Sequence, residues 1–459
     1  MPPTMRSRSG CANCKIRKRK CDEARPSCLA CQKRSIVCSG YETKLQWDCG
    51  IASRGFLRGA TLPLVSRKQR QPTSVATRAE GAVSPATPLL EYAGRGTHQS
   101  HVSRHVFEEF MQSSVHSLYN TSTDSRLRDI IGELAEESPA CYAACLALQI
   151  FHSEAGTEQF HLQFDRALQV FRGELTNTSS VPRRGSILAG LFLCTLSLEQ
   201  GMPWTRHLQC MADLYGLGKD TWQEANLADE YTCHVLEMIA VMDIPNLVFG
   251  RQTPCVKMWE RLRKLQALKH GKAPSGIESM TGLPRSLLDL LACQDDPGAE
   301  YRLWLWEGED GNLQLVHFWE AWRCSAIIYA RRNRERRGEQ ISGAGQSPHV
   351  PSTKRLTQYL VSALDALRLG LESPENSHML MANGMFYPYV IASAEIGLLR
   401  EQPEWVAALK KVHDMCLKSD TSDNIRITQS LLEAGWKRDI DVLDIHEAAR
   451  QRGVELAVF

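Results

Sequence analysis

The sequence lacks any apolar run long enough to cross a lipid bilayer. Its longest apolar-rich stretches, residues 140–151 and 187–198, are about a dozen residues each, whereas a spanning helix needs roughly 20. The first eight residues hold no apolar stretch of the kind found in a secretory signal peptide. We therefore expect a soluble intracellular protein without membrane contact, in a compartment where thiols stay reduced or bind metal.

The sequence also lacks the clustered residues that catalysis needs. Residues 101–459 show no nucleophile beside an acid–base pair and no cofactor-binding loop. Residues 216–219 have neither the spacing nor the Ser or Thr of a phosphate-binding loop. His98, His101 and His105 have no nearby cysteine and no apolar shell, which favours a chance cluster over a second metal site. We therefore predict that the protein is not an enzyme.

Alternating strand patterns and sustained apolar heptads are scarce as well. From about His101 onward, apolar residues recur at helical spacing instead. The cleanest stripe consists of Leu356, Tyr359, Leu360, Ala363, Leu364 and Leu367. These features predict a large all-α domain of packed antiparallel helices over residues 101–459. Because no coiled coil is indicated, the choice between a monomer and a dimer held by the large domain stays open.

Net charge is small, but it is unevenly distributed. The whole chain of 459 residues has a net charge of +2. Residues 1–100 hold 18 Lys and Arg against 6 Asp and Glu, and the rest hold 36 against 46. The amino-terminal part is therefore expected to bind polyanions. Residues 60–100 are rich in Ser, Thr, Pro, Gly and Arg, and a flexible linker is predicted over residues 46–100.

Six of the sixteen cysteines follow one spacing rule near the amino terminus. The pattern is C-x2-C-x6-C-x6-C-x2-C-x6-C, and its second half repeats the first at a constant shift of 17 residues. The six are Cys11, Cys14, Cys21, Cys28, Cys31 and Cys38. A structural zinc ion takes four ligands in a tetrahedron, so six thiolates satisfy two ions if two cysteines bridge them. The sequence thus predicts a metal-folded module over residues 1–45 that holds two Zn²⁺ per chain.

A disulfide framework and a metal store are the alternatives to this zinc site. Disulfides conflict with the missing signal peptide. A metal store would not need the large apolar domain that follows. The ten remaining cysteines lie in apolar context and are most simply small core residues.

A basic segment lies between the second and third cysteines of the pattern. It reads Lys15-Ile16-Arg17-Lys18-Arg19-Lys20, with five cations in six positions, and it is long enough for about one and a half helical turns. The second copy, residues 32–37, has two cations and ends apolar. We therefore expect the first helix to dock on nucleic acid and the second to complete the fold. A solvated face or a nuclear-import signal is the alternative, and import does not exclude DNA contact.

Residues 9 to about 41 resemble the fungal zinc binuclear cluster family of transcription factors. All six cysteines fit, and Pro26 matches the proline of the family's inter-repeat loop. The resemblance implies two short helices around a two-zinc cluster, bridging roles for Cys11 and Cys28, and binding of double-stranded DNA in the nucleus. It also implies that Lys18 contacts bases in CGG-type triplets, where guanine presents O6 and N7 acceptors. The expected phosphate contacts are Lys15, Arg17, Arg19 and Lys20.

Three stretches of the large domain resemble the regulatory domain of the same fungal subgroup. They are residues 281–291, 386–405 and 452–459. The resemblance implies a transcription regulator with no assigned catalysis, controlling metabolic or secondary-metabolite genes. A second copy of the chain and the transcription machinery are further candidate partners. A protein-binding scaffold or co-regulator, whose zinc module contacts protein instead of DNA, is the alternative.

Two charged segments of the large domain carry competing interpretations. The acidic residues of segment 295–310 interleave with Trp304 and Trp306, a composition that can recruit transcriptional machinery. A solvated loop with core tryptophans is the simpler interpretation. Residues 331–337 hold five arginines, which indicates an exposed helix end or an auxiliary import signal.

Overall fold

A computed structural model describes residues 11, 14, 21, 22, 24, 28–34, 36, 38, 97–115, 126–153, 157–177, 184–214, 230–338, 349–373, 376, 381–419 and 422–458. The chain divides into two units, Met1–Thr87 and Pro88–Phe459. Within the described ranges, none of the helices combines the length and the apolar character that crossing a membrane requires. Most of the predicted linker, residues 46–96, lies outside the described residues.

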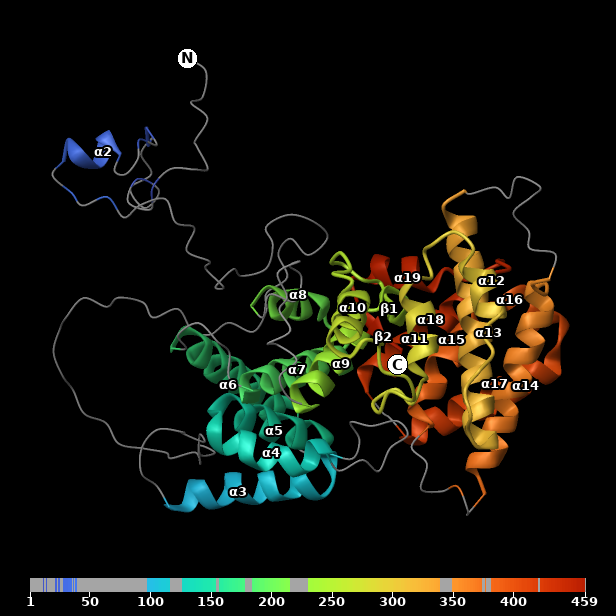
Figure 1. The fold of residues 1–459 in the computed structure, drawn as a ribbon, viewed down its shortest axis with the longest axis horizontal. Coiled ribbons are helices and arrows are strands. Elements are labelled where there is room, and N and C mark those ends of the chain that lie inside the picture. Colours follow the sequence, from blue (N-terminus) through green and yellow to red (C-terminus); the bar gives the residue numbers. More distant parts are fainter. Residues whose placement is uncertain are drawn as a thin grey trace, which may run out of the picture. The chain divides into compact units, whose positions relative to one another are not determined.

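The second unit is built mainly from helices in two neighbouring groups (Figure 1). The first group comprises α3 (Thr97–Gln112), α4 (Arg126–Glu137), α5 (Pro139–His152), α6 (Thr157–Asn177), α7 (Arg184–Glu199), α8 (Thr205–Leu214) and α9 (Glu230–Met242). The second comprises α10 (Met258–His270), α11 (Arg285–Ala292), α12 (Ala299–Trp304), α13 (Leu313–Arg336), α14 (Thr353–Leu371), α15 (Phe386–Ser393), α16 (Ile396–Glu401), α17 (Pro403–Ser419), α18 (Asp423–Trp436) and α19 (Ile445–Arg452). Two short 3₁₀ helices, η3 (Pro245–Leu247) and η5 (Asn383–Met385), connect longer elements.

Two helices organise the packing of this unit. In the first group, α5 packs against α3, α6 and α7, and in the second, α13 packs against α12, α14 and α15 (Figure 1). Helices α13 and α14 run antiparallel, since Gly370 near the end of α14 faces Gln314 near the start of α13. One continuous apolar core joins both groups. The expected large all-α domain is confirmed, and its first helix begins at Thr97, a few residues before the predicted start at His101.

Side-chain caps fix where several of these helices begin. Ser138, Asn312 and Ser352 precede α5, α13 and α14, and each side-chain oxygen accepts a hydrogen bond from the backbone N–H three residues later. Such a cap satisfies one of the amides that a helix start otherwise leaves without a partner. These residue types before an apolar-periodic run are the local reason that the helices start there.

The apolar stripe of α14 faces the core as its spacing predicts. Leu356, Leu360, Leu364 and Leu367 are fully buried, and Ala363 is nearly so. Tyr359 is the exception, with 38% of its surface exposed. Its hydroxyl accepts a hydrogen bond from Arg355 Nε at 2.9 Å, so its polar end stays at the surface of the helix.

A two-stranded sheet is an exception to the all-helical expectation. Strand β1 (Val248–Phe249) pairs antiparallel with β2 (Leu456–Ala457), with Val248 opposite Ala457 and Phe249 opposite Leu456. Just before β2, the buried carboxylate of Glu455 accepts hydrogen bonds from Thr205 N and Oγ1 at 2.7 and 2.6 Å and from Gln252 N at 2.6 Å. Residues 455–457, within the segment singled out in the sequence, thus contact both α8, 250 residues earlier in the chain, and β1, about 200 residues earlier.

Candidate metal centre

Six cysteines of the first unit meet in two overlapping groups of four sulfur atoms. One group is Cys11, Cys14, Cys21 and Cys28, and the other is Cys11, Cys28, Cys31 and Cys38. Within each group the Sγ atoms all lie within 4.8 Å of one another. The two groups share Cys11 and Cys28, the pair to which the family resemblance gives bridging roles. Each group offers the four ligands that a tetrahedral zinc ion takes.

The sulfur separations fit this chemistry. Cys11 Sγ lies 3.6 Å from Cys28 Sγ and 3.8 Å from Cys31 Sγ, and Cys14 Sγ lies 3.7 Å from Cys28 Sγ. Two sulfurs on one tetrahedral zinc with Zn–S near 2.3 Å stand roughly 3.8 Å apart. Burial raises the pKa of the Cys11 thiol to about 12. Two zinc ions would supply the positive charge that keeps these buried thiols in the thiolate form.

The second half of the cysteine pattern carries the short helix α2 (Leu29–Gln32). Its start is held from both halves of the repeat. The Cys28 sulfur accepts the Cys31 N–H at 3.3 Å. The Asp22 carboxylate accepts the N–H groups of Leu29 and Ala30 at 3.0 and 3.1 Å. These bonds hold the pKa of Asp22 below its usual value. Asp22 therefore fastens the first half of the pattern to the helix of the second.

Helix α2 begins earlier than the sequence predicts. The expected second helix covers residues 32–37, but among the described residues of that segment Lys33 and Arg34 form a turn and Gln32 alone is helical. The reason is the pair of caps from Cys28 and Asp22, which places the first helical residue at Leu29. Under the 17-residue shift, α2 corresponds to residues 12–15, and Cys14 in that interval is helical.

We expect Asp22→Ala to weaken zinc binding by the full chain, because two backbone N–H groups of α2 would lose their acceptor. The loss should be several-fold, measured by competition with a chromogenic zinc chelator under reducing conditions. Asp22→Asn keeps one acceptor oxygen and should lose less. Equal zinc affinity in wild type and Asp22→Ala would contradict a structural role for this carboxylate.

The five predicted DNA contacts lie outside the described residues. They are Lys15, Arg17, Lys18, Arg19 and Lys20. Their roles therefore stay predictions. The second half of the pattern adds Lys33 and Arg34, both exposed at the end of α2.

The two charged segments of the large domain pair with each other. Glu300 accepts hydrogen bonds from Arg331 at 3.0 Å and from Arg334. Arg337 Nη1 lies 3.2 Å from Asp295 Oδ1. The acidic run at the start of α12 thus neutralises part of the arginine run at the end of α13.

The remaining arginines of this run have partners as well. Arg332 donates to Glu395, whose carboxylate is buried, and Arg336 forms an ion pair with Asp444. Helix α13 continues through this run and ends at Arg336. The run thus forms the end of α13 as expected, with Arg336 and Arg337 exposed, and its arginines are paired with carboxylates.

Trp304 and Trp306, within the acidic segment, are half-buried against the same core. Trp306 Nε1 donates to Ser286 Oγ at 3.1 Å, and the guanidinium of Arg323 stands 5.2 Å from the ring of Trp304. These contacts agree with the simpler interpretation, in which the tryptophans serve packing.

The sulfur geometry and the helical domain agree with two family comparisons. The profile described as fungal Zn(2)-Cys(6) binuclear cluster domain matches residues 9–48. The profile described as fungal specific transcription factor domain matches residues 105–293. Residues 9–48 therefore belong to a zinc binuclear cluster domain, which binds two zinc ions, and residues 105–293 match a domain of fungal transcription factors, in agreement with the sequence resemblance. The resembling stretches 386–405 and 452–459 lie outside this match.

Individual relatives are fungal transcription regulators. The chain is 47% identical over 55 residues to the pestheic acid cluster transcriptional regulator 3 of Pestalotiopsis fici, covering 12% of this chain and 10% of that protein. It is 56% identical over 36 residues to the aspercryptin biosynthesis cluster-specific transcription regulator of Emericella nidulans, covering 8% of this chain and 6% of that protein. A match of 46% over 40 residues to the arginine metabolism regulation protein II of Saccharomyces cerevisiae covers 9% and 4%.

These matches therefore span a tenth or less of each relative's length. No solved structure matches the chain.

Proposed function

We propose that this protein is a sequence-specific DNA-binding regulator of transcription that acts in the nucleus. The observation that carries the proposal is the pair of four-sulfur groups sharing Cys11 and Cys28, with the basic segment 15–20 between two of their cysteines. Such a cluster holds a short cationic segment in one conformation, and a preformed cation array binds phosphates with less loss of conformational entropy. The net charge of +12 within residues 1–100 supports the same partner.

Within the basic segment, we propose a division between base and phosphate contacts. Lys18 contacts guanine O6 and N7 of a CGG-type triplet in the major groove. Lys15, Arg17, Arg19 and Lys20 contact phosphates, which sets the register and makes the affinity depend on salt. The family resemblance supports the role of Lys18, and the charge density supports the phosphate contacts.

Lys18→Ala tests this division. We expect it to weaken binding to a CGG-containing duplex by about 1–3 kcal/mol, and to a scrambled duplex by clearly less, because a lost base contact costs affinity only where the base is present. The measurement is a quantitative gel shift of the full chain at several salt concentrations. Arg19→Ala is the matched control, since a lost phosphate contact should weaken both duplexes alike. Equal losses on both duplexes for Lys18→Ala would show that Lys18 contacts only phosphate.

We propose that the regulated genes serve metabolism, including secondary-metabolite synthesis. The support is that two relatives are named as regulators of biosynthetic clusters, for pestheic acid and aspercryptin. Mapping of binding sites across the genome tests the proposal. Enrichment of sites upstream of clustered biosynthetic genes is the expected result, and sites spread evenly over unrelated genes would contradict it.

A protein-binding scaffold is the second candidate. It would need the zinc module to contact protein, and the five cations of segment 15–20 oppose this because protein interfaces are depleted in lysine at their centres. The same gel shifts separate the two functions. Steep salt dependence with a triplet preference supports the DNA-binding regulator, and absence of any duplex binding supports the scaffold.

A further inference from the structure

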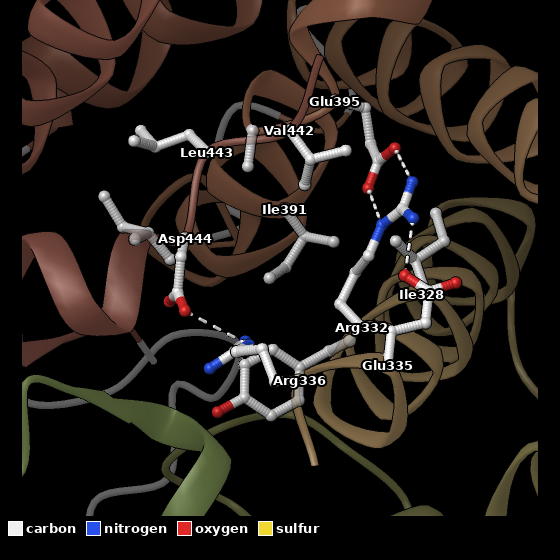
Figure 2. Close-up of a pocket in the computed structure, with 12 residues that line it drawn as sticks. Ile328, Arg332, Glu335, Arg336, Ile391, Glu395, Val442, Leu443 and Asp444 are labelled. Carbon is white, nitrogen blue, oxygen red and sulfur yellow. Dashed lines mark hydrogen bonds and ion pairs between the residues drawn. The ribbon is translucent and has the colours of Figure 1, made fainter. Parts of the chain in front are cut away.

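A pocket of about 340 Å³ lies in the second unit, where α13, the end of α15 and the segment before α19 meet (Figure 2). Its volume is at the lower end of the range typical of small-molecule sites. Apolar and charged side chains both line it (Figure 2). The apolar lining is Ile328, Ile391, Ala394, Val442, Leu443 and Ile445. All lining residues lie beyond residue 293, where the match to the regulatory-domain profile ends.

Most of the charged groups that line the pocket already pair with other protein groups. Arg332 donates to both oxygens of Glu395 at 2.9 and 2.5 Å, and its remaining terminal nitrogen donates to Glu335 at 2.7 Å. One oxygen of Asp444 accepts the N–H of Glu447 at 3.0 Å, which caps α19. Every guanidinium nitrogen of Arg332 and both carboxylate oxygens of Glu395 therefore already have a protein partner.

Arg336 is the group with capacity to spare. Its Nε lies 3.3 Å from the second oxygen of Asp444, and its guanidinium stands 5.8 Å from the centre of the Tyr329 ring. In the part of the chain that the structure describes, neither of its two Nη atoms makes a hydrogen bond. Its side chain is 33% exposed. Arg336 is thus a cation held in place from one side by a carboxylate and a ring, with N–H groups available for an acceptor.

The overall charge of the lining does not by itself select the ligand. Three carboxylates and two guanidinium groups line the pocket, a balance that would favour a cation if all five were free. Glu395 and Asp444 are occupied, however, and the side chain of Glu335 is 50% exposed, where water and salt screen it. Among the guanidinium nitrogens that line the pocket, the Nη atoms of Arg336 are therefore the ones without a protein partner in the described residues.

We propose that this pocket binds a small carboxylic acid with an apolar body. The carboxylate accepts hydrogen bonds from the Nη atoms of Arg336, whose planar fork matches a carboxylate. The apolar body packs on Ile391 and Val442, and removal of this surface from water contributes the remaining affinity. The site is independent of DNA binding by the zinc module, so either proposal can fail alone.

Ligand-observed NMR titrations of the full chain test the site with three acids of suitable size: phenylacetate, indole-3-acetate and 4-methylpentanoate. Each acid is paired with its primary amide, which keeps the shape but not the charge. We expect at least one acid to bind. Its amide should bind at least about tenfold more weakly, because charge-assisted hydrogen bonds are stronger than neutral ones. Failure of all three acids to bind, or equal binding of acid and amide, would overturn the proposal.

Three variants locate the binding. Arg336→Gln should weaken acid binding by about tenfold or more, and Val442→Phe should fill part of the pocket with a larger side chain. Arg337→Gln is the matched control, because Arg337 neighbours Arg336 but pairs with Asp295 and does not line the pocket. Circular dichroism checks that each variant folds. If Arg336→Gln does not fold, the acid-binding measurement on Val442→Phe tests the site instead. Unchanged acid binding in a folded Arg336→Gln or Val442→Phe variant would place the acid elsewhere and refute the site.

Discussion

Replacing Cys11 with alanine should remove both zinc ions from the chain, whereas replacing Cys14 should leave one complete four-sulfur group. Cys11 belongs to both groups, so its loss leaves each of them with three ligands. Cys14 belongs to one group only, and Cys28, Cys31, Cys38 and Cys11 remain together in the other. Structural zinc sites are almost always four-coordinate, and zinc binding supplies much of the folding free energy of such small modules. We therefore expect zinc content near zero in Cys11→Ala and a higher content in Cys14→Ala.

The measurement is zinc per chain by plasma emission spectroscopy after exhaustive dialysis, together with binding to the CGG-containing duplex. Cys210→Ala is the control, because this half-buried cysteine of α8 lies outside both sulfur groups. It should retain about two zinc ions, as wild type does. DNA binding should be abolished in Cys11→Ala and by chelation of the wild-type chain. Retention of two zinc ions in Cys11→Ala would contradict the shared-sulfur arrangement.

Arg251→Met should lower the free energy of unfolding of the second unit by about 3–5 kcal/mol, the usual cost of leaving a buried charge without its partner. Arg251 Nη2 donates to Asp243 Oδ1 at 2.6 Å, and the two side chains are only 6% and 1% exposed. Asp243 also accepts the N–H groups of Val256 and Met258 and so fixes the start of α10. Methionine fills the volume of the arginine stem but leaves the carboxylate with neutral donors only.

Urea unfolding followed by tryptophan fluorescence measures the effect. Arg426→Met is the control, because Arg426 and Asp423 form a pair of similar length, 2.7 Å, with side chains 67% and 54% exposed. An exposed pair of this kind contributes roughly 0–1 kcal/mol, so its loss should hardly move the unfolding midpoint. Similar shifts in the two variants would mean that burial does not determine the cost at Asp243.

The zinc centre could be predicted from the sequence because all of its ligand residues lie close together along the chain. Six cysteines at fixed spacing over fewer than 30 residues leave few ways to meet the ligand number of zinc. The role of Asp22 was missed, although a carboxylate directly after Cys21 was visible in the sequence. What the spacing does not reveal is that the chain folds back so that this carboxylate meets Leu29 and Ala30.

The helical character of the large domain was also predictable, since it depends on short-range periodicity and caps. Contacts between segments that are distant in the sequence could not be predicted. Strands β1 and β2 are two residues each and about 200 residues apart, too short for any alternation to be detected. The pocket combines residues 328–336, 391–395 and 442–445, none of which carries a motif on its own. Its key residue, Arg336, is one of five arginines in a run whose members the sequence does not distinguish.

The ion pairs of that run have a practical consequence for experiments on fragments. A synthetic peptide covering residues 331–337 would present all five guanidinium groups to solvent and would adsorb to any polyanion or import receptor offered to it. In the folded chain, Glu300, Glu395, Asp444 and Asp295 engage these groups. Excising the segment would therefore strengthen an affinity for polyanions that these carboxylates weaken in the intact protein, and transport assays on this stretch are informative only when the acidic partners are present.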